Sequence, residues 1–222
     1  MTVDFCYKIM NYVMNKNQQG NLPPDKFNAI INQGQYSFID YLLGEFQQYQ
    51  YGRAQARVEF GQNRTVRQRL TPVIYGYNLT VDSTGFAPYP GDYQTVDAMW
   101  SFYGYNRIRY AQQNSLDSYV NSVIDPVATN PVYLIEMDGF RFFPNDIAQA
   151  KLNYVKVPDK IIWAYTLDAN GRPVYDPVNS VDPVWYDTDC LEIIARALKM
   201  VGVNLQSAAI LQYANDVKMN GQ

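Results

Sequence analysis

Residues 132–144 read Val-Tyr-Leu-Ile-Glu-Met-Asp-Gly-Phe-Arg-Phe-Phe-Pro, and they indicate how the middle of this chain folds. Two runs rich in β-branched and aromatic residues flank Asp138-Gly139, a dipeptide typical of the tight turn of a β-hairpin. We therefore predict two antiparallel strands here. Phe140 and Phe142 should share one face of the second strand, with Phe143 on the other. A strand that is apolar on both faces is either enclosed in a core or paired with another subunit.

The sequence on both sides of this hairpin is also rich in β-prone residues. Strand-like segments cover residues 70–81, 96–110, 150–157 and 161–165. A second tight turn is expected at residues 168–171, where Asp, Asn and Gly cluster. We predict that residues 69–184 form an inserted β-rich module with a β-sandwich or barrel-like arrangement.

One short sequence occurs twice in the β-rich part. Tyr75-Gly76-Tyr77-Asn78 returns as Tyr103-Gly104-Tyr105-Asn106. In each copy the two tyrosines lie two residues apart, so they share a strand face. The interpretation that we favour is a pair of adjacent strands that bulge, or approach another backbone closely, at the glycine. The alternative is a platform of tyrosines on which a ligand stacks.

The N-terminal part of the chain has the apolar periodicity of helices. A first helix is predicted from apolar residues at three- and four-residue spacing, Phe5, Ile9, Tyr12 and Val13. A second, longer helix should begin after residues 22–25, which read Leu-Pro-Pro-Asp, and end near Tyr51-Gly52. Its apolar face comprises Phe27, Ile31, Phe38, Leu42 and Phe46. Gly34 and Gly44 either weaken this helix or permit close packing.

The C-terminal part is predicted to be helical as well. Residues 187–189 offer caps to a helix that Gly202 ends. The expected core stripe of this helix is Leu191, Ile194, Leu198 and Val201. A last helix is expected from residue 204 or 207 onward, and a short one over residues 116–124. The fold class is therefore α+β: residues 1–68 and 185–222 form a helical bundle from which the β-rich module projects.

The composition favours packing surfaces over catalysis. The chain has 20 Tyr, 10 Phe and 3 Trp among 222 residues, no His, and only 18% charged residues. Without histidine it lacks the commonest general acid–base and the commonest metal ligand. Tyrosine brings apolar area and a hydrogen-bonding tip together, which suits large contact surfaces. We expect a structural or assembly protein that uses no cofactor or metal and is not an enzyme.

Other sequence features agree with this expectation. No nucleophile elbow and no phosphate-binding or dinucleotide-binding glycine loop is present in the sequence. We expect neither a signal peptide nor a segment that crosses a bilayer. Cys6 and Cys190 each lie in a predicted helix and are expected to be buried free thiols.

Five arginines lie close together in an otherwise charge-poor stretch, where only Glu59 opposes them. They are Arg53, Arg57, Arg64, Arg67 and Arg69. The net charge of −3 argues against phosphate-backbone binding as the main activity, but it leaves room for a local basic strip. This strip is a candidate interface or DNA-facing surface, and a solvated face is the alternative. If the strip makes an interface, Arg67→Glu should leave the monomer folded and impair assembly.

Aromatic residues of the β-rich part form a second candidate, an aromatic contact surface. Its members are Tyr75, Tyr77, Tyr103, Tyr105, Phe140, Phe142 and Phe143. Trp100, Trp163 and Trp185 are interpreted as core or interface residues, with a binding groove as the alternative.

A carboxylate-based glycan hydrolase is a further possibility, because it needs only two acids on facing walls of a cleft. The acids in or beside the β-rich part are Asp92, Asp97, Asp117, Glu136, Asp138, Asp182, Asp187 and Asp189. Turn and cap roles account for most of these residues, so we do not favour catalysis.

Several stretches, by their order and spacing, resemble virion structural proteins from tailed phages of Bacteroidetes, the crAss-like group in particular. They are residues 22–28 with Gln33, Tyr36 and Phe38; residues 138–144; residues 152–158 with Trp163; and residues 171–177, 181–182 and 201–205. Together they cover most of the chain. The arginine-rich stretch of residues 53–69 has no place in the family pattern.

The resemblance implies a head–tail connector, a neck ring subunit that docks next to the portal. Such proteins commonly form twelve-fold rings around the DNA exit channel. The implied partners are further copies of the same chain, the portal, other neck and tail proteins, and passing DNA that is contacted without sequence specificity. No membrane and no small-molecule substrate is implied. The protein would be made in the bacterial host cytoplasm and lie in the neck or tail region of the virion. The alternative is a carbohydrate-binding module of a tail or receptor-binding protein.

Overall fold

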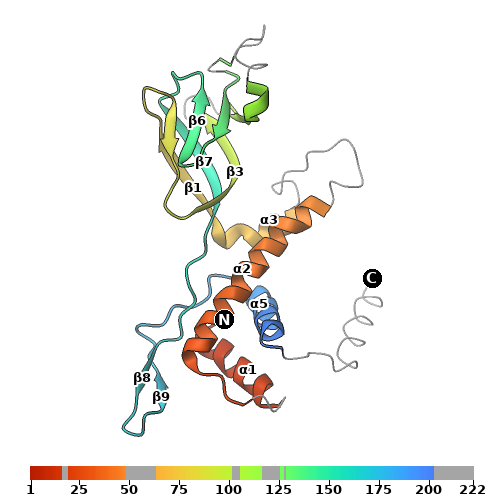
Figure 1. Ribbon diagram of the computed structural model, residues 1–222, viewed down its shortest axis with the longest axis vertical. Coiled ribbons are helices and arrows are strands. Elements are labelled where there is room, and N and C mark those ends of the chain that lie inside the picture. Colours follow the sequence, from red (N-terminus) through yellow and green to blue (C-terminus); the bar gives the residue numbers. More distant parts are fainter. Residues whose placement is uncertain (17–19, 49–63, 102–105, 117–125, 128, 203–222) are drawn as a thin grey trace. The chain divides into compact units, whose positions relative to one another are not determined.

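The protein is a mixed α and β chain that divides into two compact units (Figure 1). The computed structural model describes residues 1–16, 20–48, 64–101, 106–116, 126–127 and 129–202. Unit 1 combines residues 1–56 with residues 159–222, and unit 2 is residues 57–158. Both ends of the chain therefore belong to one unit, and the second unit is inserted between them. The predicted helix over residues 116–124 and the last predicted helix lie outside the described residues, except for Leu116.

Unit 1 contains three of the described helices and a small hairpin. They are α1 (Val3–Lys16), α2 (Pro24–Gln48), α5 (Asp187–Met200), β8 (Tyr165–Leu167) and β9 (Pro173–Tyr175). The predicted helices near both ends are confirmed, as is the tight turn between β8 and β9. A positive φ of 80° at Gly202 follows the end of α5, the conformation that glycine adopts most readily.

Helix α1 buries a different face from the one that its sequence predicted. Phe5 and Tyr12 are 51% and 69% exposed. The buried face comprises Val3, Cys6, Met10 and Met14. Both sets of residues recur at helical spacing, so periodicity alone could not decide between them. On α5, Leu191 of the predicted stripe is likewise 50% exposed, while Ile194 and Leu198 are buried.

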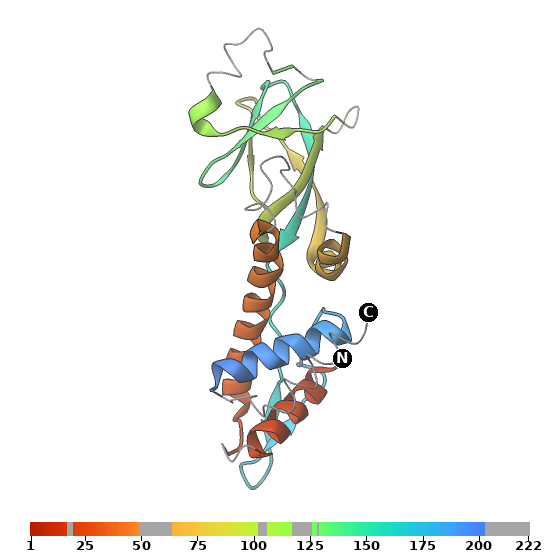
Figure 2. The same cartoon turned by 90° about the vertical axis from the view of Figure 1, so that its right-hand side faces the viewer.

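Helices α2 and α5 pack closely against each other, with α5 lying across α2 (Figure 2). The contact depends on Gly34, because a Cβ atom there would lie 2.9 Å from the carbonyl oxygen of Ile193 and 3.1 Å from the Cβ of Ala197. No atom lies within 4 Å of the same position at Gly44. The sequence predicted that these glycines either weaken the helix or permit close packing, and at Gly34 the glycine permits close packing.

An extended segment, residues 159–163, runs along α2 and completes the core of unit 1. Amide side chains of the helix hold its backbone: Asn32 bonds to Ile161 and Gln35 to Asp159. Trp163 and Trp185 are buried, as expected for core residues. The segment of residues 159–184, which sequence placed in the β-rich module, thus lies in unit 1, because its aromatic and backbone groups pack against the helices.

Unit 2 holds α3 (Arg64–Leu70), a 3-10 turn η2 (Thr71–Val73) and two sheets. One sheet has the order β1-β7-β3, from β1 (Ile74–Thr80), β7 (Gln149–Lys156) and β3 (Tyr93–Ser101). The other has the order β2-β6-β5-β4, from β2 (Phe86–Pro88), β6 (Gly139–Phe143), β5 (Val132–Ile135) and β4 (Arg109–Tyr110). A second 3-10 turn, η3 (Gln113–Ser115), follows β4. All described pairs are antiparallel except β4 with β5.

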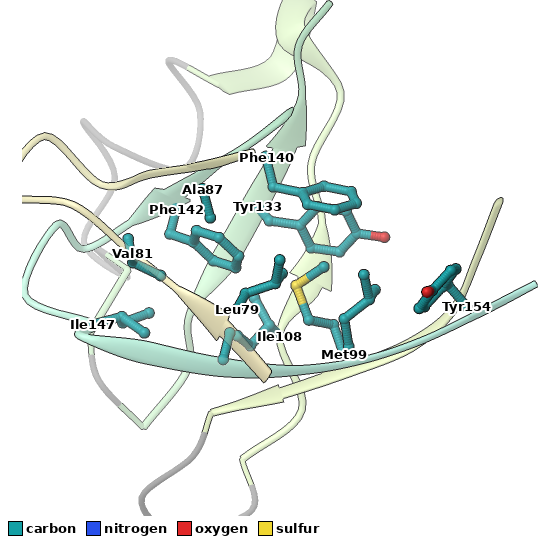
Figure 3. Close-up of a cluster of buried hydrophobic side chains, with 12 residues drawn as sticks. Leu79, Val81, Ala87, Met99, Ile108, Tyr133, Phe140, Phe142, Ile147 and Tyr154 are labelled. Atoms are coloured by element: carbon teal, nitrogen blue, oxygen red, sulfur yellow. The ribbon is translucent and has the colours of Figure 1, made fainter. Parts of the chain in front are cut away.

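A single cluster of buried side chains from both sheets forms the main core of unit 2 (Figure 3). Phe140 and Phe142 of β6 are fully buried there, so the expectation that they belong to an exposed contact surface is wrong. Of the two alternatives for this strand, enclosure in a core or pairing with another subunit, enclosure applies. Phe143 points the other way and packs against a smaller cluster with Val132 and Leu134.

The hairpin predicted at Asp138-Gly139 is confirmed, because β5 pairs with β6 across this turn. Gly139 is required for a reason that the sequence did not reveal. A Cβ atom at this position would lie 2.2 Å from the carbonyl oxygen of Ala87 on β2. The two strands therefore approach too closely for any side chain.

The second copy of the Tyr-Gly-Tyr-Asn sequence lies largely outside the described residues, so its pairing with the first copy stays a prediction. β7 lies between β1, which carries the first copy, and β3, which ends just before the second. Tyr103 and Tyr105 lie outside the described residues. The first copy lies entirely within the described residues.

Candidate functional surfaces

Among the described members of the arginine strip, Arg67 is paired with an acid inside unit 2. Arg67 binds the carboxylate of Asp97 with both terminal nitrogens, each at 2.7 Å. Asp97 is the extra residue of a β-bulge in β3, and its carboxylate is almost completely buried. Arg67 therefore holds α3 to the sheet. Arg64 is exposed on the same helix, and Arg53 and Arg57 lie outside the described residues.

Helix α3 is positioned by apolar contacts as well as by this ion pair. Val66 and Leu70 are buried on one side of the helix, while Arg64 lies on its exposed side. Arg69 is half-buried. Arg64 is therefore the member of the described strip that is most available to a partner.

Tyr75 and Tyr77 lie at an exposed edge of unit 2. They are 55% and 49% exposed on β1, which among the described strands pairs only with β7. The pairing register places them on the same sheet face as Tyr154 and Leu152. The amino group of Lys156 lies 5.1 Å from the centre of the Tyr75 ring, within the range of a cation–π contact.

More tyrosines continue from this edge into the core. The rings of Tyr89 and Tyr93 stack at 4.5 Å, and Tyr93 lies 6.0 Å from Tyr154. The Tyr154 hydroxyl donates a hydrogen bond of 2.7 Å to Asp92. Burial raises the pKa of Tyr93 to about 12, and burial together with the Asp92 carboxylate also raises the pKa of Tyr154. Both hydroxyls therefore keep their protons at neutral pH, and that of Tyr154 acts as a donor to Asp92.

The acids considered for glycan hydrolysis make structural contacts instead. The Glu136 carboxylate accepts two hydrogen bonds from Arg141, at 2.5 and 3.1 Å. Asp182 accepts a hydrogen bond from the backbone nitrogen of Val3 and so caps α1. Asp187 contacts the amino group of Met1, and Asp189 is buried. Asp117 lies outside the described residues. These contacts, with those of Asp92 and Asp97, give most of the described acids a role in the fold.

The two cysteines are buried free thiols, as the sequence predicted. Burial raises the pKa of Cys6 from 9.0 to about 12 and that of Cys190 to about 11. A thiol that stays protonated is a poor nucleophile and a poor metal ligand. Among the described residues, no group of three or more Cys, Asp or Glu side chains could hold a metal ion.

Sequence reasoning missed a row of side chains that crosses the sheet β1-β7-β3. Strand pairing aligns Asn78 with Lys151, and Lys151 with Trp100. An isolated bridge then aligns Trp100 with Arg107. These four residues, which we call the outer row, come from four separate segments of the chain. The only sequence signal is that each residue stands next to a core residue within a strand-like pattern.

Among the regions in which unit 1 exposes apolar side chains are helix α1 and the β8–β9 hairpin. Phe5 and Tyr12 form a stripe on α1, with the half-buried Ile9 between them. Leu167, Val174 and Val178 are exposed on and beside the β8–β9 hairpin. Scattered apolar residues are ordinary on protein surfaces, but a stripe along one helix face is more informative.

No protein-family model and no curated protein matches this chain. In the part of the chain that the structure describes, no helix is long and apolar enough to cross a membrane.

Proposed function

We propose that this protein is a non-enzymatic structural subunit of a phage virion, a neck ring subunit that oligomerises around the DNA exit channel next to the portal. The resemblance in sequence supplies the place in the virion. The observation that carries the assembly part is the second apolar stripe of α1, where Phe5 and Tyr12 are 51% and 69% exposed. This stripe lies opposite the face that packs into unit 1, and the described residues leave Phe5 and Tyr12 about half exposed or more.

Burial of such a stripe between subunits would remove two aromatic rings from water. An aromatic side chain that is fully buried contributes about 1.5–3 kcal/mol relative to an exposed one. A closed ring needs two different faces on each subunit, because each copy contacts its neighbours head to tail. The exposed apolar residues of the β8–β9 hairpin, Leu167, Val174 and Val178, offer a candidate for the second face.

The roles of the two units in the assembly are part of the same proposal. Three helices of unit 1 would act as a bundle that makes ring and portal contacts. The two sheets of unit 2, with a common core between them, support a sandwich-like module that projects. Contact with DNA would be independent of base sequence.

Native mass spectrometry and negative-stain images of the purified chain test the proposal. We expect closed rings of identical subunits, alone or on added portal rings. The double variant Phe5→Ser/Tyr12→Ser should remain folded and fail to form them. Met137→Ser is the matched control, because it removes an apolar side chain that is 89% exposed in the β5–β6 turn. A wild-type monomer that also fails to join portal rings would overturn the proposal.

A second candidate function is carbohydrate binding, which the exposure of Tyr75 and Tyr77 favours. Two exposed rings on one strand face offer an apolar surface on which a sugar ring can stack, with hydroxyl groups for hydrogen bonds. Binding of the chain to a glycan array, lost in Tyr75→Ala/Tyr77→Ala, would support this function. The absence of any signal on the glycan array would exclude carbohydrate binding as the function.

A further inference from the structure

The outer row, Asn78, Lys151, Trp100 and Arg107, faces away from the core of unit 2. Each of its members is a chain neighbour of a deeply buried residue, and these neighbours are Leu79, Leu152, Met99 and Ile108. Figure 3 shows Leu79, Met99 and Ile108 pointing into the core. Because successive side chains of a strand point to opposite faces, the outer row lies on the outer face of the sheet.

This face is accessible in unit 2. Asn78, Lys151 and Arg107 are exposed, and Trp100 is half-buried. The next outward-facing residues on one side of the row are Gly76, Asn153 and Ala98, and on the other side Thr80 and Gln149. Among the described residues that align with the row, its neighbours along the strands are therefore amides, a hydroxyl and small residues.

The outer row carries two cations, Lys151 and Arg107, although the whole chain carries a net charge of −3. None of the aligned outward-facing residues is an acid. Asp97 occupies the neighbouring bulge, but Arg67 neutralises its carboxylate. Lys151 and Arg107 stand on either side of Trp100, so their backbone positions are separated by two strand spacings, about 10 Å.

Cations beside an aromatic ring are the combination with which proteins bind nucleic acid without sequence preference. Lysine and arginine contact phosphates, amides donate further hydrogen bonds to the backbone, and an aromatic ring packs against a base or sugar. We propose that the outer row is a binding site for the phosphate backbone of DNA, with Lys151 and Arg107 on phosphates and Trp100 against the nucleoside between them.

This inference deepens the proposed function and rests on it for the choice of DNA as the nucleic acid. It replaces the predicted arginine strip, whose member Arg67 is engaged within the fold, with a different set of residues. Two phosphate contacts per chain make a weak site, so binding becomes appreciable where several copies meet one DNA molecule.

The test measures binding of short single-stranded and duplex oligonucleotides of mixed sequence to the full chain. The chain is coupled densely to a sensor surface, so that several copies can meet one strand. We expect binding that is independent of sequence and weakens as salt rises, with a slope of log K against log salt of about −0.9 per phosphate contact on duplex DNA. Lys151→Gln and Arg107→Gln should each lower the affinity and reduce this slope by about one.

Trp100→Leu separates stacking from charge. It should weaken binding of the single strand by roughly 5- to 150-fold and leave the salt slope unchanged. Lys26→Gln is the matched control, because it removes one exposed positive charge from α2 in unit 1 and should have no effect. Circular dichroism of each variant verifies that the fold is intact.

Three outcomes would overturn the inference. One is the absence of oligonucleotide binding at low salt. Another is binding that Lys26→Gln weakens as much as Lys151→Gln does. The third is binding of polyglutamate but of neither oligonucleotide, which would assign the face to an acidic protein. In each case rings that still form would leave the proposed ring function standing.

Discussion

Asn28 of α2 and Trp163 of the extended segment exchange two hydrogen bonds through a single side chain. The Asn28 amide nitrogen donates to the Trp163 carbonyl oxygen at 3.2 Å, and the Trp163 backbone nitrogen donates to the Asn28 oxygen at 2.8 Å. Asn32 forms the same pair of bonds with Ile161, at 2.8 and 2.9 Å. The helix thus presents to the segment the donors and acceptors that a neighbouring β-strand would offer.

Asn28→Ala should destabilise unit 1 by about 2 kcal/mol, because it leaves both backbone groups of Trp163 without their partner. Urea unfolding followed by helical circular dichroism measures the change. Gln33→Ala, at an exposed amide of the same helix, is the control and should lie within about 0.5 kcal/mol of the wild type. Equal effects of the two substitutions would contradict the role of the paired bonds.

The two glycines of α2 should respond in opposite directions to the same substitution. Gly34→Ala should destabilise by about 1–3 kcal/mol, because the new methyl group would lie 2.9 Å from the Ile193 carbonyl oxygen. Gly44→Ala should stabilise the helix by up to about 1 kcal/mol, because nothing lies within 4 Å of its Cβ position. Thermal unfolding of both variants provides the comparison, and a stable Gly34→Ala protein would mean that α5 does not pack as described.

Gly139→Ala should destabilise its unit more than Gly34→Ala does, although each substitution adds a single methyl group. The added Cβ would lie 2.2 Å from a backbone oxygen of β2, which cannot move without breaking its pairing with β6. We expect a loss of at least about 3 kcal/mol in unfolding free energy. Gly91→Ala, with no atom within 4 Å, serves as the control and should unfold like the wild type.

Loss of the Arg67–Asp97 ion pair should affect folding before it affects assembly. Arg67→Met leaves the buried Asp97 carboxylate uncompensated and should cost about 3 kcal/mol. Arg67→Glu should be worse, which revises the expectation drawn from the sequence. Adding Asp97→Asn to Arg67→Met should restore part of the loss, and Arg64→Met on the same helix should be neutral. A fully stable Arg67→Met protein would show that the pair does not hold α3.

Stability should fall at alkaline pH because of the buried thiols. Burial raises the pKa of Cys6 from 9.0 to about 12 and that of Cys190 to about 11. The unfolded chain therefore loses these protons first, and the unfolding free energy decreases as pH rises from about 9 through the folded-state values. Urea unfolding of unit 1 at several pH values should show a shallower decrease in Cys6→Ala/Cys190→Ala. An unchanged slope would exclude the thiols as its cause.

Local signals explain what the sequence predicted correctly. The turn at Asp138-Gly139 depends on a dipeptide with its own conformational preference, and the helices follow from apolar spacing. Neither signal shows which residues distant in the sequence will pack against each other. On α1 two apolar stripes satisfy the same periodicity, and only the docking of α5 and the extended segment decides which one is buried.

The contacts that decide the candidate surfaces are distant in sequence. Asn28 and Trp163 are 135 positions apart, so an amide-rich helix could not be distinguished from an amide-rich surface. Arg67 finds Asp97 only because β3 bulges at that residue. The outer row likewise exists only once β7 lies between β1 and β3, a strand order that no local pattern encodes.

The discontinuity of unit 1 sets an order of events during synthesis. The ribosome completes residues 57–158 before it makes the segment that pairs with Asn28, Asn32 and Gln35. Domains fold as their sequences become complete, so unit 2 is the first part of the chain that can reach its native state. Until α5 emerges, α1 and α2 keep their apolar faces uncovered. The N-terminal helices are therefore made first but covered last. During synthesis they are the part of the chain that is most prone to associate prematurely with other chains.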